Sequence, residues 1–117
     1  MDEIVRRVRE FLDELEKRSI AIEWFGDVRM DTVLRKIDPP LLARFGRAGL
    51  RSLGIGIESG SDRVLASLRK GETSEIYVRA NRILATSAVA AQYGFILGLP
   101  GETLADAKAT YALVARM

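Results

Sequence analysis

Cysteine and histidine are both absent from the 117 residues of this chain. Iron–sulfur clusters are held by cysteine thiolates and, in some centres, by histidine. The chain therefore has no ligand of the usual kind for such a cluster. The lack of cysteine also agrees with a reducing compartment, and we expect a cytoplasmic protein.

Long apolar runs and a large excess of one charge are absent as well. No stretch reaches the roughly 18 apolar residues that a transmembrane helix requires, so we predict no membrane association. The 18 basic and 16 acidic residues leave a net charge of +2, and no basic run alternates with aromatic residues, so nucleic-acid binding is not indicated. With 48% hydrophobic and 29% charged residues, the composition is typical of one small soluble α/β domain.

Hydrophobic periodicity and capping residues predict an amphipathic opening helix followed by three strand–helix units. The helices are expected at residues 2–18, 39–49, 61–69, 74–86 and 104–117, and the strands at 19–25, 53–59 and 89–98. Asp38 with Pro39 marks the start of one helix, and Thr103 with Asp106 forms a capping box before the last. Strands that alternate with helices imply right-handed crossovers, so the three strands should be adjacent and parallel, in chain order.

Two of these strands have one bulky face and one nearly bare face. In the strand at 53–59, leucine and isoleucine alternate with two glycines and Glu58. In the last strand, aromatic and leucine side chains alternate with Gly94, Ile96 and Gly98. A bare face on neighbouring strands leaves room for a ligand, and Glu58 projects a carboxylate into that room. The pattern predicts a binding site at the carboxyl ends of the strands.

Five segments, in a fixed order, carry a resemblance to a known family. They are Trp24–Asp31 (WFGDVRMD), Phe45–Gly49 (FGRAG), Gly54–Ser61 (GIGIESGS), Leu68–Thr73 (LRKGET) and Phe95–Thr103 (FILGLPGET). Each alone is weak, because glycine-rich strand ends occur in many barrels. Together, at this spacing, they resemble the radical S-adenosylmethionine (radical SAM) enzymes, in particular the group often found with a cobalamin-binding domain. The resemblance runs from about residue 20 to residue 110.

The resemblance implies an α/β fold, a partial, six-stranded, TIM-like (β/α) barrel whose third to fifth strands match the three predicted here. The family's defining C-x3-C-x2-C motif, which holds a [4Fe–4S] cluster after the first barrel strand, is missing. We therefore interpret residues 1–117 as one partial radical SAM core domain, inactive alone, whose partners are S-adenosylmethionine and the rest of the parent barrel. Its unpaired edge strands also lead us to expect self-association.

For the parent protein, the resemblance implies an enzyme that cleaves S-adenosylmethionine reductively. An electron from the cluster breaks the C5′–S bond, which gives methionine and a 5′-deoxyadenosyl radical that abstracts a substrate hydrogen. The parent would then be an iron–sulfur oxidoreductase or methyltransferase, with cobalamin as a further cofactor in the associated group. The matching segments do not identify the substrate.

The resemblance also assigns individual residues to S-adenosylmethionine. The polar residue at the position of Glu58 contacts the ribose hydroxyls or nearby polar groups, and Ser59 offers a hydroxyl at the same strand end. In one branch of the family, a basic residue at the position of Lys70 pairs with the carboxylate of S-adenosylmethionine, for which a lysine is chemically suited. The alternative for Glu58 is an internal ion pair with Arg29 or Lys70, and the alternative for Lys70 is simple exposure to solvent.

Further candidates lie on the last and the first predicted strands. Gly94, Ile96 and Gly98 resemble the fifth-strand motif whose backbone and aliphatic side chain pack against adenine. The acid that follows departs by one position from the form G-x-I-x-G-x-x-E, so we assign Glu102 to the turn before the last helix. Glu23, if its strand face looks into the same interior, is a candidate for a ribose or amino-group contact.

Two other functions stay open. A different (β/α) barrel enzyme, such as an aldolase or a phosphate-binding barrel, would carry a lysine or a metal-binding triad at its strand ends, and the sequence indicates neither. A non-catalytic interaction module with a degenerate barrel is the second alternative. A C-x3-C-x2-C motif encoded upstream of this chain would exclude that module.

Overall fold

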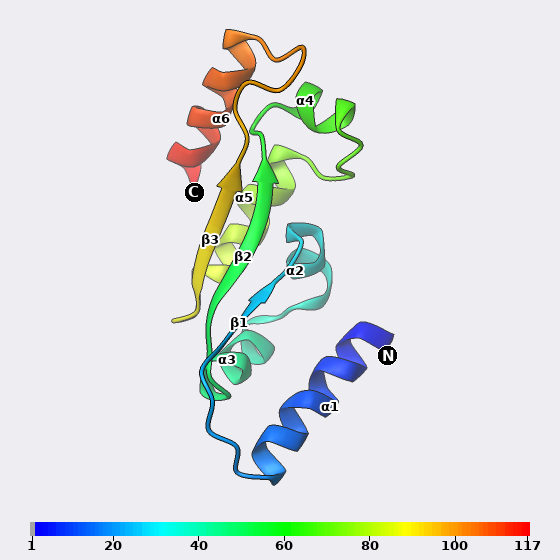
Figure 1. Cartoon of the computed structure of the whole chain (residues 1–117), viewed down its shortest axis with the longest axis vertical. Helices are drawn as coiled ribbons and strands as arrows, with labels where there is room; N and C mark the ends of the chain where they lie inside the picture. Colours follow the sequence, from blue (N-terminus) through cyan, green and yellow to red (C-terminus); the bar gives the residue numbers. More distant parts are fainter. Residues whose placement is uncertain (1) are drawn as a thin grey trace.

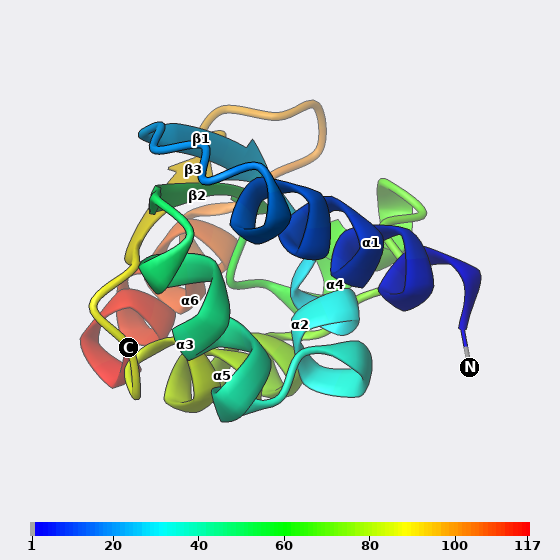
Figure 2. The ribbon, with the colours of Figure 1, turned by 90° about the horizontal axis from the view of Figure 1, so that it is seen from below.

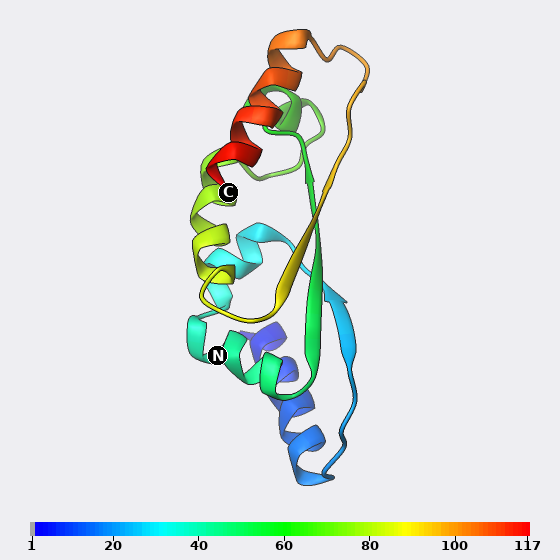
Figure 3. The ribbon, with the colours of Figure 1, turned by 90° about the vertical axis from the view of Figure 1, so that its left-hand side faces the viewer.

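The fold is a three-stranded parallel sheet with the helices gathered on one of its faces. The computed structural model describes residues 2–117. Its elements are, in chain order, α1 (Glu3–Lys17), β1 (Trp24–Asp27), α2 (Met30–Lys36), α3 (Pro39–Arg47), β2 (Leu50–Glu58), α4 (Asp62–Ser67), α5 (Ser74–Leu84), β3 (Ala90–Phe95) and α6 (Leu104–Arg116) (Figure 1). Figure 3 shows the sheet edge-on with the helices to one side, so the other face is bare. Within residues 2–117, no helix combines the length and the apolar character needed to cross a membrane.

The strand order β1-β2-β3, with both pairs parallel, confirms the predicted topology. The predicted bounds are less accurate. β1 begins at Trp24 rather than at residue 19, because pairing with β2 starts where Trp24 meets Leu50. β2 correspondingly begins at Leu50 and not at residue 53. β3 ends at Phe95 rather than at residue 98, because Phe95 pairs with Glu58, the last residue of β2.

Helix α2 is absent from the sequence prediction, and its start depends on a distant residue. It has seven residues, and its N-cap residue, Arg29, makes no capping hydrogen bond through its side chain. Instead, the Asp31 N–H donates a hydrogen bond of 2.8 Å to the carboxylate of Glu72, which lies in the loop after α4. Because that carboxylate comes from far along the chain, the sequence around α2 contains no cap signal.

Local caps begin the helices that the sequence does predict. The Asp38 carboxylate accepts a hydrogen bond of 2.8 Å from the Leu41 N–H at the start of α3, and the Ser61 hydroxyl caps α4. Thr103 and Asp106 form the predicted capping box of α6. Each cap satisfies an amide that the first helical turn leaves unpaired, so the side chain fixes where the helix begins.

The hydrophobic core lies between the sheet and the helices that cover it (Figure 2). Leu53, Ile55 and Ile57 of β2 are all 7% exposed or less, and they belong to one buried cluster with Leu42 of α3 and Tyr77 of α5. The glycines that alternate with them in β2 turn toward the bare face. This arrangement confirms the predicted bulky and bare faces of the strand.

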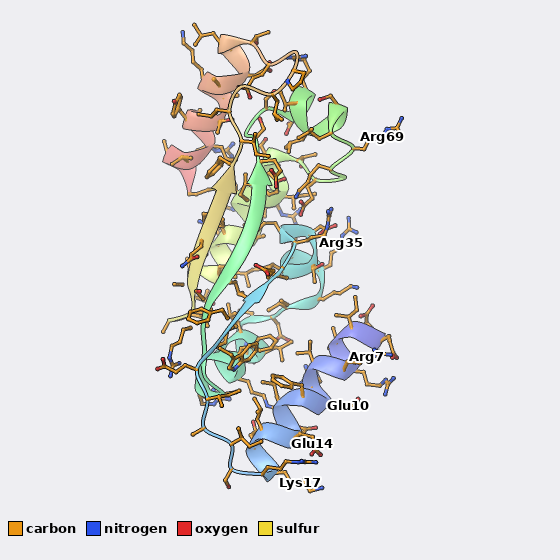
Figure 4. The ribbon with its side chains drawn as sticks, viewed as in Figure 1. Arg7, Glu10, Glu14, Lys17, Arg35 and Arg69 are labelled. Atoms are coloured by element: carbon orange, nitrogen blue, oxygen red, sulfur yellow. The ribbon has the colours of Figure 1, made fainter. Side chains whose placement is uncertain are left out.

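Helix α1 packs on the sheet as an amphipathic helix, as predicted. The Phe11 ring meets the Trp24 ring edge-on, with 5.4 Å between their centroids. Glu10, Glu14 and Lys17 lie on the outer surface of the helix (Figure 4).

Asp106 connects the start of α6 to the turn that precedes α4. Its carboxylate accepts hydrogen bonds from the Ser61 hydroxyl at 2.7 Å and from the Thr103 amide at 2.8 Å, and it pairs with the Arg63 guanidinium. The hydrogen bond from Arg63 is the main reason why the pKa of Asp106 lies well below its usual range.

We expect Asp106→Asn to lower the thermal midpoint near neutral pH, because the amide cannot form the ion pair with Arg63. Since the folded-state pKa is depressed, the carboxylate stabilises the fold fully above the unfolded pKa of about 4, and this stabilisation is lost as the pH falls toward the folded value. The difference in midpoint between parent and variant, followed by circular dichroism, should therefore shrink from about pH 7 to about pH 2.5. A difference of the same size at both pH values would contradict this assignment.

Candidate functional site

The bare face of the sheet carries a hollow of about 720 Å³ that all three strands line. Gly54 and Gly56 of β2 and Gly94 of β3 form its floor, and Asp27 and Gln92 flank Gly54 on the neighbouring strands. A Cβ at position 54 would lie 2.4 Å from the Asp27 carboxylate, so a larger residue there would displace that side chain. The predicted glycine-lined face is thus a depression near the carboxyl ends of the strands, where parallel βα folds bind ligands.

Glu58 ends β2 with its carboxylate folded back over this floor. Its φ of +68° lies in the left-handed region, and the pairing of β2 with β3 shifts register between Gly56 and Glu58. An irregularity of this kind re-aims the side chain at a strand end. A Cβ at position 56 would lie 2.5 Å from Glu58 Oε1, so the bare position and the carboxylate depend on each other.

The left-handed backbone at Glu58 gives a stability prediction. We expect the free energy of unfolding of Glu58→Gly to exceed that of Glu58→Ala by about 1 kcal/mol. Alanine keeps the Cβ that strains this backbone conformation, whereas glycine removes it. Both variants lack the carboxylate, so the comparison isolates the backbone. Equilibrium urea unfolding measures the difference, and an alanine variant at least as stable as the glycine variant would contradict the strain.

Lys70 places its ammonium between two carboxylates beside the same strand end. Its Nζ lies 3.8 Å from Glu58 Oε1 and 3.7 Å from Glu72 Oε1, and its side chain is only 17% exposed. Neither distance is a hydrogen bond, and the ammonium donates none to any residue within 2–117. The internal ion pair foreseen for Glu58 is therefore present but loose.

Glu72 is a central residue that the sequence analysis does not identify. Its side chain is fully buried, and its Oε1 lies 3.7 Å from both the Arg29 guanidinium and the Lys70 ammonium. The Tyr77 hydroxyl, which also donates to the Ile57 carbonyl at 3.1 Å, contacts the same oxygen at 3.4 Å. Burial, more than the adjacent carboxylate, raises the pKa of this hydroxyl.

Arg29 and Asp31 are engaged within the chain. Arg29 donates a hydrogen bond of 2.7 Å to the carbonyl of Lys70 and one of 3.1 Å to the Asp31 carboxylate. The bond to Asp31 raises the pKa of Arg29. Burial raises the pKa of Asp31, but its contacts with Arg29 outweigh burial and the net pKa is lowered. Both residues thus fasten the end of β1 to the loop that carries Lys70.

Of the candidates predicted on the last strand, Gly94 lies in β3, and Ile96 and Gly98 lie in the segment that follows it. Gly94 pairs with Gly56 and lines the floor, and the Ile96 N–H donates a hydrogen bond of 2.9 Å to the Glu58 carbonyl. Gly98, with φ of +80°, donates its N–H to the Glu102 carboxylate at 2.8 Å. That bond confirms Glu102 as part of the turn before α6. The structure therefore brings this segment next to Glu58.

Ser59 and Glu23 do not join this group. The Ser59 side chain is fully buried; its hydroxyl accepts a hydrogen bond from the Ser61 amide at 3.0 Å and lies 3.4 Å from the Thr110 hydroxyl of α6. Glu23 precedes β1 at the amino end of the sheet, where its side chain is 72% exposed and pairs with Arg51 at 3.2 Å. The predicted strand face of Glu23 is wrong, because no strand forms there.

The charged groups of the described region do not form a metal centre. Within residues 2–117, no group of three or more acidic, histidine or cysteine side chains is arranged to hold a metal ion. The features gathered here are a glycine floor, one partly buried carboxylate and one ammonium.

Comparisons with known proteins bear on these features. The family model of the radical SAM superfamily matches residues 1–114. The anaerobic magnesium-protoporphyrin IX monomethyl ester cyclase of Rubrivivax gelatinosus is 33% identical over 104 residues, which cover 89% of this chain and 18% of that protein. A tRNA-2-methylthio-N(6)-dimethylallyladenosine synthase of Cereibacter sphaeroides is 41% identical over 105 residues, which cover 88% of this chain and 22% of that protein.

A solved structure shares the fold. The cobalamin-dependent S-adenosylmethionine radical enzyme OxsB, with aqua-cobalamin and S-adenosylmethionine bound, matches with a TM-score of 0.81 and 24% identity. The match covers 93% of this chain and 16% of OxsB. The chain thus spans less than a quarter of the length of the relatives named here.

Proposed function

Because the chain belongs to the radical SAM superfamily, we propose that it forms the part of a radical SAM barrel that holds S-adenosylmethionine. Its three parallel βα units have the fold of the corresponding part of OxsB. Within residues 2–117, β1 and β3 each pair with β2 alone, so each has one edge without a partner strand. We propose that further strands of the same barrel pair with these edges.

The observation that carries this proposal is the meeting of Glu58 and Lys70 at the glycine-floored hollow. Both are mostly buried, yet within residues 2–117 neither the carboxylate nor the ammonium makes a hydrogen bond. Their side chains are 25% and 17% exposed, so water reaches both groups, and a polar ligand would replace that water as their hydrogen-bond partner. Around them, the carboxylates of Asp31, Glu58 and Glu72 outnumber the cations of Arg29 and Lys70. This excess of negative charge suits S-adenosylmethionine, whose sulfonium and ammonium outnumber its carboxylate.

The geometry favours a particular orientation of the ligand. Lys70 would donate hydrogen bonds to the carboxylate of S-adenosylmethionine, because a lysine ammonium provides several donors to one anionic group. Glu58 would accept hydrogen bonds from the ribose hydroxyls. The backbone of Gly94 and Gly98 and the side chain of Ile96 would pack along the adenine. Ser59 and Glu23 are left out of this proposal, because their side chains lie elsewhere.

S-Adenosylmethionine supplies the C5′–S bond whose reductive cleavage begins the chemistry of this family. The residues of this chain bind and orient the ligand and exclude water from it. They do not fit a [4Fe–4S] cluster, because the sequence has neither cysteine nor histidine. The cluster ligands would have to come from elsewhere in the protein, and the enzyme activity of the whole protein is part of this proposal.

The relatives do not determine the substrate. One is named for a porphyrin ester and another for an adenosine of tRNA, so the same segment accompanies unlike reactions. OxsB binds cobalamin, and we propose cobalamin as a further cofactor of the protein that carries this chain. Detection of cobalamin in the purified protein by its visible absorbance would test that part separately.

Affinity for S-adenosylmethionine tests the site. In the whole protein, reconstituted anaerobically, we expect Glu58→Ala and Lys70→Ala each to weaken binding by about ten- to a hundred-fold in calorimetry, since a charge-assisted contact contributes on the order of 1.5–3 kcal/mol. Arg69→Ala is the matched control, because this neighbouring cation points away from the sheet (Figure 4).

A double-mutant cycle separates ligand contacts from an internal ion pair. If Glu58 and Lys70 mainly pair with each other, the losses of stability in Glu58→Ala and Lys70→Ala, measured without ligand, are strongly coupled. If they bind the ligand instead, the coupling in stability is small, and each substitution lowers the affinity for S-adenosylmethionine. Parent-like affinity in both single variants would refute the site, and the fold would stand.

A further inference from the structure

Glu72 places a second carboxylate 3.7 Å from the Lys70 ammonium, in addition to that of Glu58. The loop between α4 and α5, which carries both residues, runs past the end of β2 and the start of α2 (Figure 1). Gly71, with φ of +74°, separates the two residues and lets the chain turn between them. The Glu72 side chain is completely buried, whereas Lys70 and Glu58 are 17% and 25% exposed.

The two carboxylates compete for one ammonium at almost equal distance. Lys70 Nζ lies 3.8 Å from Glu58 Oε1 and 3.7 Å from Glu72 Oε1, and both separations exceed a hydrogen bond. With one of these carboxylates alone, the ammonium would close to a direct, charge-assisted bond. With both, it stays between them, and neither Glu58 nor Lys70 is consumed by the other.

Glu72 itself is held firmly in place. Its Oε2 accepts the Asp31 N–H at 2.8 Å, and its Oε1 is contacted by the buried Tyr77 hydroxyl at 3.4 Å. Arg29 completes the arrangement, because it lies 3.7 Å from Glu72 and binds the Lys70 carbonyl at 2.7 Å. The backbone of Lys70 is therefore held by Arg29, and a firmly placed carboxylate lies beside its head group.

We propose that Glu72 is a positioning residue for the S-adenosylmethionine site: it keeps the Lys70 ammonium from closing onto Glu58, so that both remain available to the ligand. This inference rests on the proposed function. It gives Glu72, which does not touch the ligand, an effect on ligand affinity that acts through Lys70. It also explains why a fully buried carboxylate lies next to a site that already has one.

The test is the affinity of the whole, reconstituted protein for S-adenosylmethionine, measured by calorimetry. We expect Glu72→Gln to weaken binding about ten-fold, because Lys70 then pairs with Glu58. In the Lys70→Ala background the same substitution should change affinity less than about two-fold, because no ammonium remains to be positioned. A merely structural role would lower affinity equally in both backgrounds. Glu75→Gln is the control, since Glu75 is exposed and, among residues 2–117, pairs with Arg116 alone, at 3.3 Å.

The outcomes distinguish this inference from the proposed function. If Glu58→Ala and Lys70→Ala both leave affinity unchanged, the proposed function fails and this inference fails with it. If they weaken binding while Glu72→Gln does not, or if Glu72→Gln acts equally without Lys70, the positioning role alone is overturned. Should Glu72→Gln not fold, Glu72→Asp, which draws the charge back from Lys70, replaces it in the same cycle and should weaken binding by about three-fold or more.

Discussion

Gly49→Ala is expected to lower the free energy of unfolding by about 4 kcal/mol or more. Gly49 joins α3 to β2 with φ of +103°, a backbone conformation that side chains strain. A Cβ there would lie 1.8 Å from the carbonyl oxygen of Ile22. That carbonyl cannot easily retreat, because the Trp24 N–H two residues later donates a hydrogen bond of 3.0 Å to the Gly49 carbonyl. Relief of the clash would therefore separate the start of β1 from β2.

Equilibrium urea unfolding, followed by circular dichroism, measures this effect. Gly46→Ala is the matched control, because Gly46 lies within α3 and a Cβ there would meet the Val89 side chain at an ordinary 3.6 Å. Alanine is the better helix former, so the control should keep or slightly raise the stability of the parent. A Gly49→Ala variant within about 1 kcal/mol of the parent would show that the α3–β2 connection is not rigid.

Glu72→Ala is expected to lower the free energy of unfolding by about 3 kcal/mol, the second largest effect. The change removes the acceptor for the Asp31 N–H and leaves the guanidinium of Arg29 and the ammonium of Lys70 without their buried anion. Uncompensated groups of this kind are costly in a buried position.

An exposed carboxylate, that of Glu75, provides the control for Glu72→Ala. Glu75, at the start of α5, pairs with Arg116 on the surface, and Glu75→Ala should change stability by less than about 0.5 kcal/mol. Urea unfolding of both variants at neutral pH decides the matter. Equal losses of unfolding free energy in the two variants would mean that the buried contacts of Glu72 contribute no more to stability than the surface ion pair of Glu75.

The strand topology could be predicted because it depends on local patterns. Alternating residues on β2 fix which side faces the helices, and local caps such as Asp38 and Thr103 fix where helices begin. The bounds of β1 and β3 could not be predicted in the same way. β3 ends at Phe95, where it pairs with Glu58 at the end of β2, and the sequence of β3 alone does not contain that information.

The candidate site was predictable to the same degree. Glu58, Lys70 and Gly94 stand in motifs whose spacing is visible in the sequence, and the structure brings them to one strand end. Glu72 was missed because the residues that give it meaning, Arg29 and Asp31, lie far away in the chain. The same distance explains why helix α2, whose first turn Glu72 caps, has no local signal.

The backbone at Glu58 has a consequence for laboratory evolution. At this position the residue that best fits the left-handed conformation is glycine, whereas the proposed ligand contact requires a carboxylate. A library randomised at codon 58 and sorted only for heat resistance should therefore drift toward glycine. The same library sorted for binding of S-adenosylmethionine should return glutamate, so the two selections would favour different residues at position 58.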